Sequence, residues 1–281
     1  MKKAIQQMMI GPLCKDYNKT LELLKHIKEI GFDAIELNGY MIHKTPFIVR
    51  VLTKMAGMPS GSAGKLDWRS LIKESGLEVA SLHTDLGSLE RDLESVVNEA
   101  LEFKTKYLVI TGMYRFDYTN VEQLSLLCSR LNAVGEKVKK YGLSLLYHNH
   151  NVEFKRLSSG EFVYEYLLQH LNPDFVNFEF DSYWAIEAGV DIYSLLTKIG
   201  KRNRLHHIND RGSNKVGPFV TPILESDSIE LGNGSLDLKK LLAIDKINET
   251  DYVVLEMHKN YIDGSRILSI EISGKYLNEN M

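Results

Sequence analysis

Acidic and histidine side chains recur where short apolar segments of this sequence end. An ionisable side chain in a buried strand costs free energy unless it is paired or bound to a metal. A single histidine at such a place is usually structural, but six of eight apolar segments here end in this way, which indicates a functional cluster. The residues are Glu36, His83, His148 with His150 and Glu153, Glu179 with Asp181, His206 with His207 and Asp210, and Glu256 with His258.

The two-residue period of a strand sorts these side chains by face. In the segment FVNFEFD, Glu179 and Asp181 are two residues apart and share a face, with Asp181 nearer the strand end. Two carboxylates that close are tolerable beside a cation and costly otherwise. His206 and His207 are adjacent, so only one of them can point inward. Mixed histidine and carboxylate ligands suit Mn²⁺, Fe²⁺, Co²⁺ or Zn²⁺.

The elements that must position these residues follow a repeating pattern of apolar segment, amphipathic helix and, commonly, a glycine. Eight strands alternating with helices favour a parallel sheet. Eight such units closing on themselves predict a (β/α)8 TIM barrel, α/β in class and a single domain over residues 1–281; the alternative is an open doubly wound sheet, although no G-x-G-x-x-G motif follows the first strand. The predicted strands are 7–13, 32–37, 77–83, 107–111, 143–148, 175–181, 205–208 and 252–256.

Two long connections interrupt this pattern, over residues 39–64 and 211–233. Each follows a predicted strand, and the loops after the strands form the face of a TIM barrel where active sites lie. Both connections are therefore candidate lids.

The composition limits the classes of function. Hydrophobic residues make up 44% of the 281 residues and charged residues 25%, with a net charge of −3, so no nucleic-acid or membrane partner is indicated. Cys14 and Cys128 are far apart, no signal peptide is recognisable and no apolar run approaches the roughly 20 residues of a membrane span. We expect a cytoplasmic enzyme that acts on a small molecule and can form homo-oligomers.

Five motifs in order along the chain resemble the xylose-isomerase-like superfamily, and within it the sugar phosphate isomerase/epimerase branch, with inosose-dehydratase-like relatives. The similarity extends from the segment GFDAIEL onward and implies the same TIM barrel. The motifs are YHNHNVEF (147–154), FEFDSYW (178–184), HHIND (206–210), LGNGSLDLKKLL (231–242) and VVLEMH (253–258).

The resemblance implies one divalent metal ion, of Mn, Co, Zn, Fe or Mg, held by Asp181, His207 and Glu256 at about 2.0 to 2.3 Å. We therefore expect His207 inside the barrel and His206 packed outward against a helix. Where relatives place a metal-binding glutamate on the fifth strand, this chain has His148. Either His148 is the fourth ligand or Glu153 supplies a carboxylate; we favour His148 because its position matches.

The activity implied is that of a metal-dependent isomerase or epimerase acting on a sugar, keto-sugar or cyclitol through a metal-stabilised enediolate. Glu256 or Glu153 is the expected base, and His148 or His150 the acid.

The expected substrate-binding residues are His83, Lys155 and Trp184, the last stacking on a sugar face. Three alternatives stay open. A histidine on strand five also suits an inosose-dehydratase-like lyase. An abasic-site endonuclease would need a basic groove, which the net charge of −3 argues against. The third alternative is a non-catalytic sugar-binding barrel.

Overall fold

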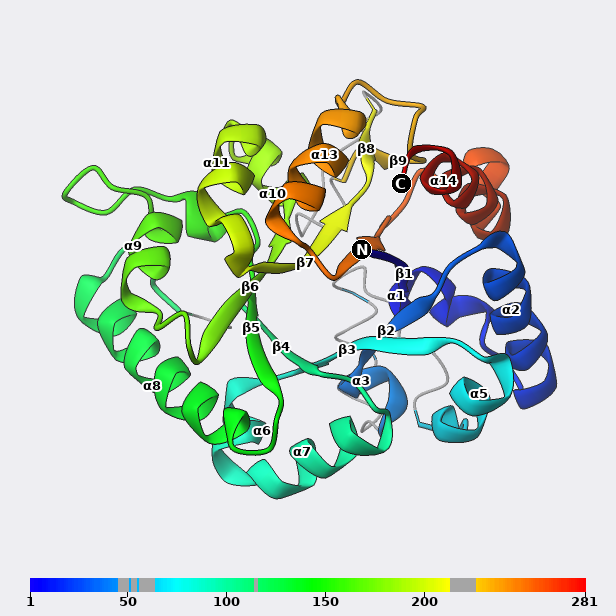
Figure 1. Ribbon diagram of the computed structural model, residues 1–281, viewed down its shortest axis with the longest axis horizontal. Coiled ribbons are helices and arrows are strands. Elements are labelled where there is room, and N and C mark those ends of the chain that lie inside the picture. Colours follow the sequence, from blue (N-terminus) through cyan, green and yellow to red (C-terminus); the bar gives the residue numbers. More distant parts are fainter. Residues whose placement is uncertain (45–50, 52–54, 56–63, 114–115, 213–225) are drawn as a thin grey trace. The chain divides into compact units, whose positions relative to one another are not determined.

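The protein is described by a computed structural model that covers residues 1–281 except 45–50, 52–54, 56–63, 114–115 and 213–225. Its strands have the order of a closed, parallel, eight-stranded barrel, β1-β10-β7-β6-β5-β4-β3-β2 (Figure 1). The predicted (β/α)8 fold is confirmed. The chain divides into two compact units, one of Met1–Ala80, Ile208–Leu242 and Tyr252–Met281 and the other of Ser81–His207 and Ala243–Asp251.

The first unit contains both ends of the chain. Parallel pairing of β1 with β2 and with β10 sets buried Ala4 beside Ala34 and Val254. Its elements are β1 (Lys2–Gln6), α1 (Gln7–Ile10), η1 (Gly11–Leu13), α2 (Tyr17–Ile30), β2 (Ala34–Asn38), α3 (Gly39–Ile42), α5 (Trp68–Ser75), β8 (Asp210–Arg211), β9 (Ser228–Ile229), β10 (Tyr252–Leu255), η4 (Ile262–Gly264) and α14 (Arg266–Asn280). Strand β3 (Glu78–Thr84) and helix α13 (Leu238–Asn248) run from one unit into the other.

The prediction for the first strand was wrong. Residues 7–13 form helical turns, and the strand is Lys2–Gln6 instead. The apolar run after Gln7 suggested a strand, but the Gln6 side chain accepts a hydrogen bond from the Met8 N–H and so begins a helix at Gln7. The two buried apolar residues of the real strand, Ala4 and Ile5, are too few to stand out by pattern.

The second unit holds most of the strands that end in histidine or carboxylate. Helix α8 packs along β5 and β6 (Figure 1). The elements are α6 (Leu86–Arg91), α7 (Leu93–Glu102), β4 (Tyr107–Thr111), α8 (Val121–Lys139), β5 (Ser144–His148), η2 (Val152–Phe154), α9 (Val163–His170), β6 (Val176–Asp181), α10 (Ser182–Glu187), α11 (Ile192–Ile199), η3 (Gly200–Arg202) and β7 (Asn203–Ile208), whose last residue is assigned to the first unit.

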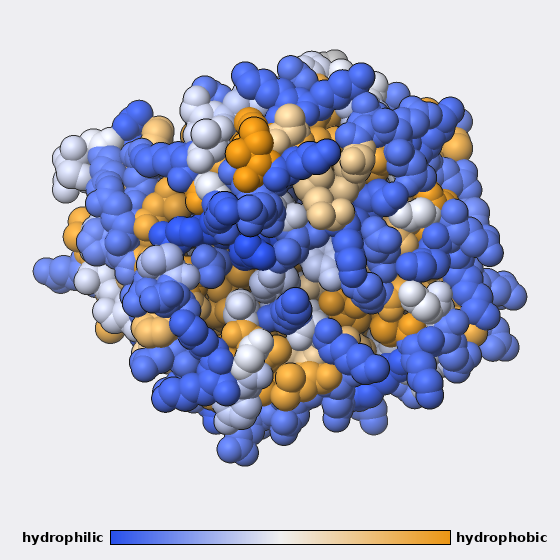
Figure 2. Space-filling model, in the orientation of Figure 1, coloured by the Kyte–Doolittle hydropathy of each residue, from blue (hydrophilic) through white to orange (hydrophobic). Residues whose placement is uncertain are grey.

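The two candidate lids fall largely on residues that lie outside the described part of the chain. Hydrophilic residues dominate the face drawn in Figure 2, with apolar residues in patches between them. Among the described helices, none combines the length and apolar character needed to cross a membrane. Cys14 and Cys128 are both buried and free.

Candidate metal and active site

The register of three neighbouring strands brings the candidate ligands of the second unit together. In the parallel pair β5–β6, His148 lies beside Glu179, and in the pair β6–β7, Asp181 lies beside His207. All four residues are buried, with at most 3% of the surface of each exposed. Side-chain alternation along β6 puts both carboxylates on one face, as the sequence predicted.

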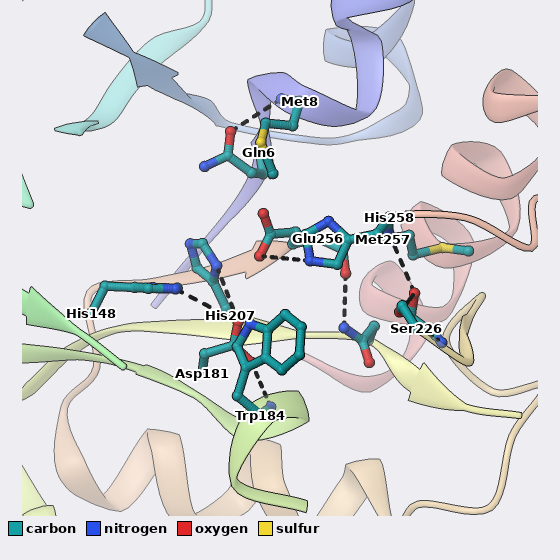
Figure 3. Close-up of polar contacts among 12 residues, drawn as sticks. Gln6, Met8, His148, Asp181, Trp184, His207, Ser226, Glu256, Met257 and His258 are labelled. Carbon is teal, nitrogen blue, oxygen red and sulfur yellow. Dashed lines mark hydrogen bonds and ion pairs between the residues drawn. The ribbon is translucent and has the colours of Figure 1, made fainter. Parts of the chain in front are cut away.

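His148, Asp181 and His207 each direct one ligand atom to a common point (Figure 3). These three atoms lie within 4.8 Å of one another. Asp181 Oδ2 is 3.9 Å from His148 Nε2 and 3.7 Å from His207 Nδ1. Two ligands bound at about 2.1 Å to one ion can be up to roughly 4 Å apart, so both separations suit a shared cation. Two imidazoles and one carboxylate form a donor set typical of first-row divalent metals.

The Asp181 carboxylate is held with one oxygen turned toward the two histidines. Its Oδ1 accepts a hydrogen bond from the Trp184 N–H at 3.3 Å and thereby caps helix α10. Its backbone is fixed by Asn149, whose side chain accepts from the Asp181 N–H at 2.9 Å and donates to the Asp181 carbonyl at 3.0 Å. Because Oδ1 serves the helix cap, Oδ2 is the oxygen that faces His148 and His207.

Glu179 lies deeper in the barrel and contacts three imidazoles. Its Oε2 is 2.9 Å from His148 Nδ1, 3.0 Å from His83 Nε2 and 3.5 Å from His207 Nε2. Complete burial opposes the negative charge of Glu179, but the charges of His207 and His83 and the hydrogen bonds from His148 and His207 outweigh it and hold the pKa well below its usual value. The predicted substrate residue His83 is therefore placed against Glu179.

His206 points away from this cluster, and the prediction for the two adjacent histidines is confirmed. His206 Nδ1 lies 2.6 Å from Asp245 Oδ2 on helix α13, and neither side chain is exposed. The His206 ring also packs on Phe180, with ring centroids 5.6 Å apart. His207, on the opposite face of β7, is the histidine that faces Asp181 and Glu179.

Glu153 is fully buried and both of its oxygens are hydrogen bonded. Oε1 accepts from the Tyr147 hydroxyl at 2.7 Å, and Oε2 accepts from the His150 backbone N–H at 2.8 Å. Burial raises the pKa of Glu153, against the lowering effect of these two hydrogen bonds. The Tyr147 hydroxyl lies 3.1 Å from that of Tyr118, so the carboxylate ends a short buried chain of hydroxyl groups.

The other expected residues of this unit occupy two environments. The ring centroids of His150 and His148 are 5.0 Å apart, and those of His150 and Trp184 are 5.7 Å apart, so the His150 ring neighbours both of the others. Trp184 is 3% exposed and packs edge-on to Tyr183. Lys155 is exposed, and its charge lowers the pKa of the exposed Asp117 after the larger effect of the Thr119 hydrogen bonds.

Glu256 belongs to the first unit, where it directly follows β10. Its N–H donates to the Ile208 carbonyl at 3.1 Å, and its carbonyl accepts from the Asn209 side chain at 2.9 Å. The side chain is buried, with Oε2 4.0 Å from His258 Nε2 (Figure 3). Burial, and then the Glu256 charge, raise the pKa of Tyr40.

Two buried carboxylates, Glu179 and Asp245, have contacts that the sequence analysis did not predict. Glu179 was placed on the correct face, but its contacts with imidazoles from three strands depend on register. Asp245 lies in the amphipathic helix α13 and carries no motif. A carboxylate two residues before Asp181 in an otherwise apolar strand was the one available signal for Glu179.

A family model for the xylose isomerase-like TIM barrel matches residues 24–273. The chain belongs to this family. Inosose dehydratase of Salmonella typhimurium (strain LT2) is 28% identical over 126 residues, which are 42% of this chain and 40% of the relative. The aligned part therefore spans less than half of that curated relative.

Two solved structures have the same fold as this chain. A sugar phosphate isomerase/epimerase from Parabacteroides distasonis ATCC 8503 superposes with a TM-score of 0.76 at 19% identity, over 98% of this chain and 93% of that chain. The IolI protein, solved with a bound zinc atom, has a TM-score of 0.69 at 15% identity, over 99% of this chain and 97% of its own. Both likenesses concern the fold.

Proposed function

We propose that this family member is a divalent-metal-dependent enzyme that isomerises or epimerises a keto-sugar or cyclitol. The observation that carries the proposal is the convergence of His148, Asp181 and His207 within 4.8 Å of one another. Buried ionisable groups gathered without a role would be costly, whereas together they match a metal donor set. Zinc in the IolI protein and the sugar isomerase/epimerase relative support the same assignment.

The proposed ligands are His148, Asp181, His207 and Glu256. Glu256 joins the set on the strength of its motif and of its burial at the end of β10. When bound, a divalent cation supplies a Lewis acid that polarises a carbonyl oxygen and a neighbouring hydroxyl. His148 takes the strand-five position, because Glu153 has both oxygens committed to Tyr147 and His150.

The remaining roles belong to proton transfer and substrate binding. We propose Glu256 as the base that removes the proton next to the carbonyl and His150 as the partner acid, because His150 is only half-buried. Glu153 would hold the His150 backbone in place through its hydrogen bond. Burial raises the pKa of Glu153, which also suits a carboxyl group that transfers a proton, the role expected for Glu153 from the sequence.

The substrate would lie against the rings of His150 and Trp184, whose centroids are 5.7 Å apart, with a sugar face packed on the Trp184 ring. Lys155, exposed after η2, would reach a substrate from the rim. His83 would contact it from the deeper side, next to Glu179.

A second candidate is dehydration of a keto-cyclitol. The similarity to inosose dehydratase favours it, as does the histidine-rich end of strand five. Loss of a hydroxyl after the same proton abstraction would give water and an unsaturated ketone. The two candidates share the first step and differ in the second, which is either return of a proton or loss of the hydroxyl.

The test incubates the metal-loaded protein with a panel of keto-sugars and keto-cyclitols in D₂O. We expect deuterium to enter the carbon next to the carbonyl of at least one compound, as seen by NMR. A product of unchanged mass apart from deuterium identifies the isomerase or epimerase, and a product lighter by one water identifies the lyase. The Asp181→Asn variant is the control. No exchange with any compound, or equal exchange in the control, would overturn the proposal.

A further inference from the structure

Two histidines of the second unit each bridge the same pair of carboxylates on β6. His148 has Nδ1 at 2.9 Å from Glu179 Oε2 and Nε2 at 3.9 Å from Asp181 Oδ2. His207 has Nε2 at 3.5 Å from Glu179 Oε2 and Nδ1 at 3.7 Å from Asp181 Oδ2. The Glu179 carboxylate thus faces one edge of each imidazole ring, and the Asp181 carboxylate faces the other edge.

The geometry gives the two carboxylates different tasks. The distances from Asp181 Oδ2 to His148 Nε2 and to His207 Nδ1 are those of ligands that share an ion. Glu179 is at hydrogen-bond distance from His148, and a carboxylate accepts such a bond from a ring N–H. A neutral imidazole carries one proton, so a proton on Nδ1 leaves the lone pair of Nε2 directed at the metal position.

We propose that Glu179 is a positioning residue that fixes the tautomer of His148 and the ring orientations of both His148 and His207. This rests on the proposed function, because it assigns those rings to a metal ion. The arrangement is the carboxylate–histidine–metal triad in which an outer carboxylate orients a ligand and raises its basicity. Here one buried carboxylate serves two ligands, because β6 lies between β5 and β7 in the sheet.

The chain offers a matched control in the pair His206 and Asp245. Asp245 Oδ2 lies 2.6 Å from His206 Nδ1, and both side chains are fully buried. Like Glu179, Asp245 is a carboxylate that contacts a histidine of β7, but this histidine lies on the opposite face of the strand. Removing its charge should disturb the packing around β7 without touching the metal position.

The first experiment examines the metal-free full-length protein with ¹⁵N-labelled histidine by NMR at pH 8. The His148 signals are assigned by their disappearance in His148→Gln. We expect His148 to carry its proton on Nδ1, and this pattern to be lost or mixed in Glu179→Gln while Asp245→Asn leaves it unchanged. A proton on Nε2 of His148 in the wild type would overturn the proposal, and so would an unchanged tautomer in Glu179→Gln.

The second experiment titrates Zn²⁺ or Mn²⁺ into the same proteins by calorimetry. We expect Glu179→Gln to weaken binding about 10- to 100-fold, and Asp245→Asn to bind as the wild type does while melting at a lower temperature. Equal affinity in Glu179→Gln and the wild type would refute the positioning role. A wild type that binds neither ion would refute the proposed function, while the metal-free NMR result would still decide the tautomer. If Glu179→Gln does not fold, the position of the His148 proton in the wild-type NMR spectrum alone decides whether the proposal stands.

Discussion

Replacing each of the adjacent histidines 206 and 207 with alanine should produce opposite phenotypes. His206→Ala removes a buried ring whose Nδ1 is 2.6 Å from Asp245 Oδ2. Breaking a buried pair commonly costs about 3 to 5 kcal/mol. Asp245 Oδ1 keeps hydrogen bonds from Asn203 and Thr250, at 3.2 and 3.0 Å, so we expect the lower end, about 3 kcal/mol. At roughly 2 to 4 °C per kcal/mol for a chain of this size, the melting temperature should fall by about 6 to 12 °C.

His207→Ala removes a proposed ligand instead. Its ring lies 3.5 Å from Glu179 and 3.7 Å from Asp181, and without it two buried carboxylates lose a shared partner. Loss of a residue that merely orients a ligand costs about 10- to 100-fold in metal affinity, so loss of the ligand itself should cost at least about 100-fold. Turnover should fall with metal content.

The assay measures bound metal, turnover and thermal unfolding on the same preparations of both variants and the wild type. His206→Ala should bind metal normally at a temperature where it is folded, and His207→Ala should not. If His206→Ala lost the metal and His207→Ala kept it, the assignment of the two faces of β7 would be refuted.

Three further substitutions test other parts of the structure. Glu153→Gln should lower turnover strongly and leave metal content nearly intact, because it disturbs the hydrogen bond to His150; loss of the metal would make Glu153 a ligand. Burial, and then the hydrogen bond to Asp251, raise the pKa of Tyr107 to about 12. The phenol is protonated in both states below about pH 10, so its share of the stability, roughly 2 kcal/mol, should be lost as pH rises from about 10 to 12. Denaturant titrations of Tyr107→Phe and the wild type should therefore converge over that range, and a constant gap would contradict the prediction. Arg202→Met removes a guanidinium that donates to three backbone carbonyls and should cost about 3 kcal/mol by denaturant titration; a change below about 1 kcal/mol would contradict it.

The sequence was most informative where the spacing of residues within one strand determines the face on which each side chain lies. Strand alternation placed Glu179 and Asp181 on one face and separated His206 from His207, and the structure agrees. The repeat of strand, helix and glycine was sufficient for the barrel. Such patterns need only the geometry of a single element.

Contacts between distant segments were not predictable in this way. The meeting of Glu179 with His83 and His148 depends on the register of separate strands, and the Asp245–His206 pair depends on how α13 packs. The first strand was missed because the Gln6 cap, a side-chain hydrogen bond, overrides the apolar pattern after it.

The central claim is that His148, Asp181 and His207 belong to one metal site. The most direct test is the metal content of the purified full-length protein and of Asp181→Asn, measured by elemental analysis after incubation with Mn²⁺ or Zn²⁺ and removal of free ion. We predict one tightly held ion per wild-type chain and far less than one in Asp181→Asn. A wild type that retains no ion, or an Asp181→Asn variant that retains as much as the wild type, would contradict the claim.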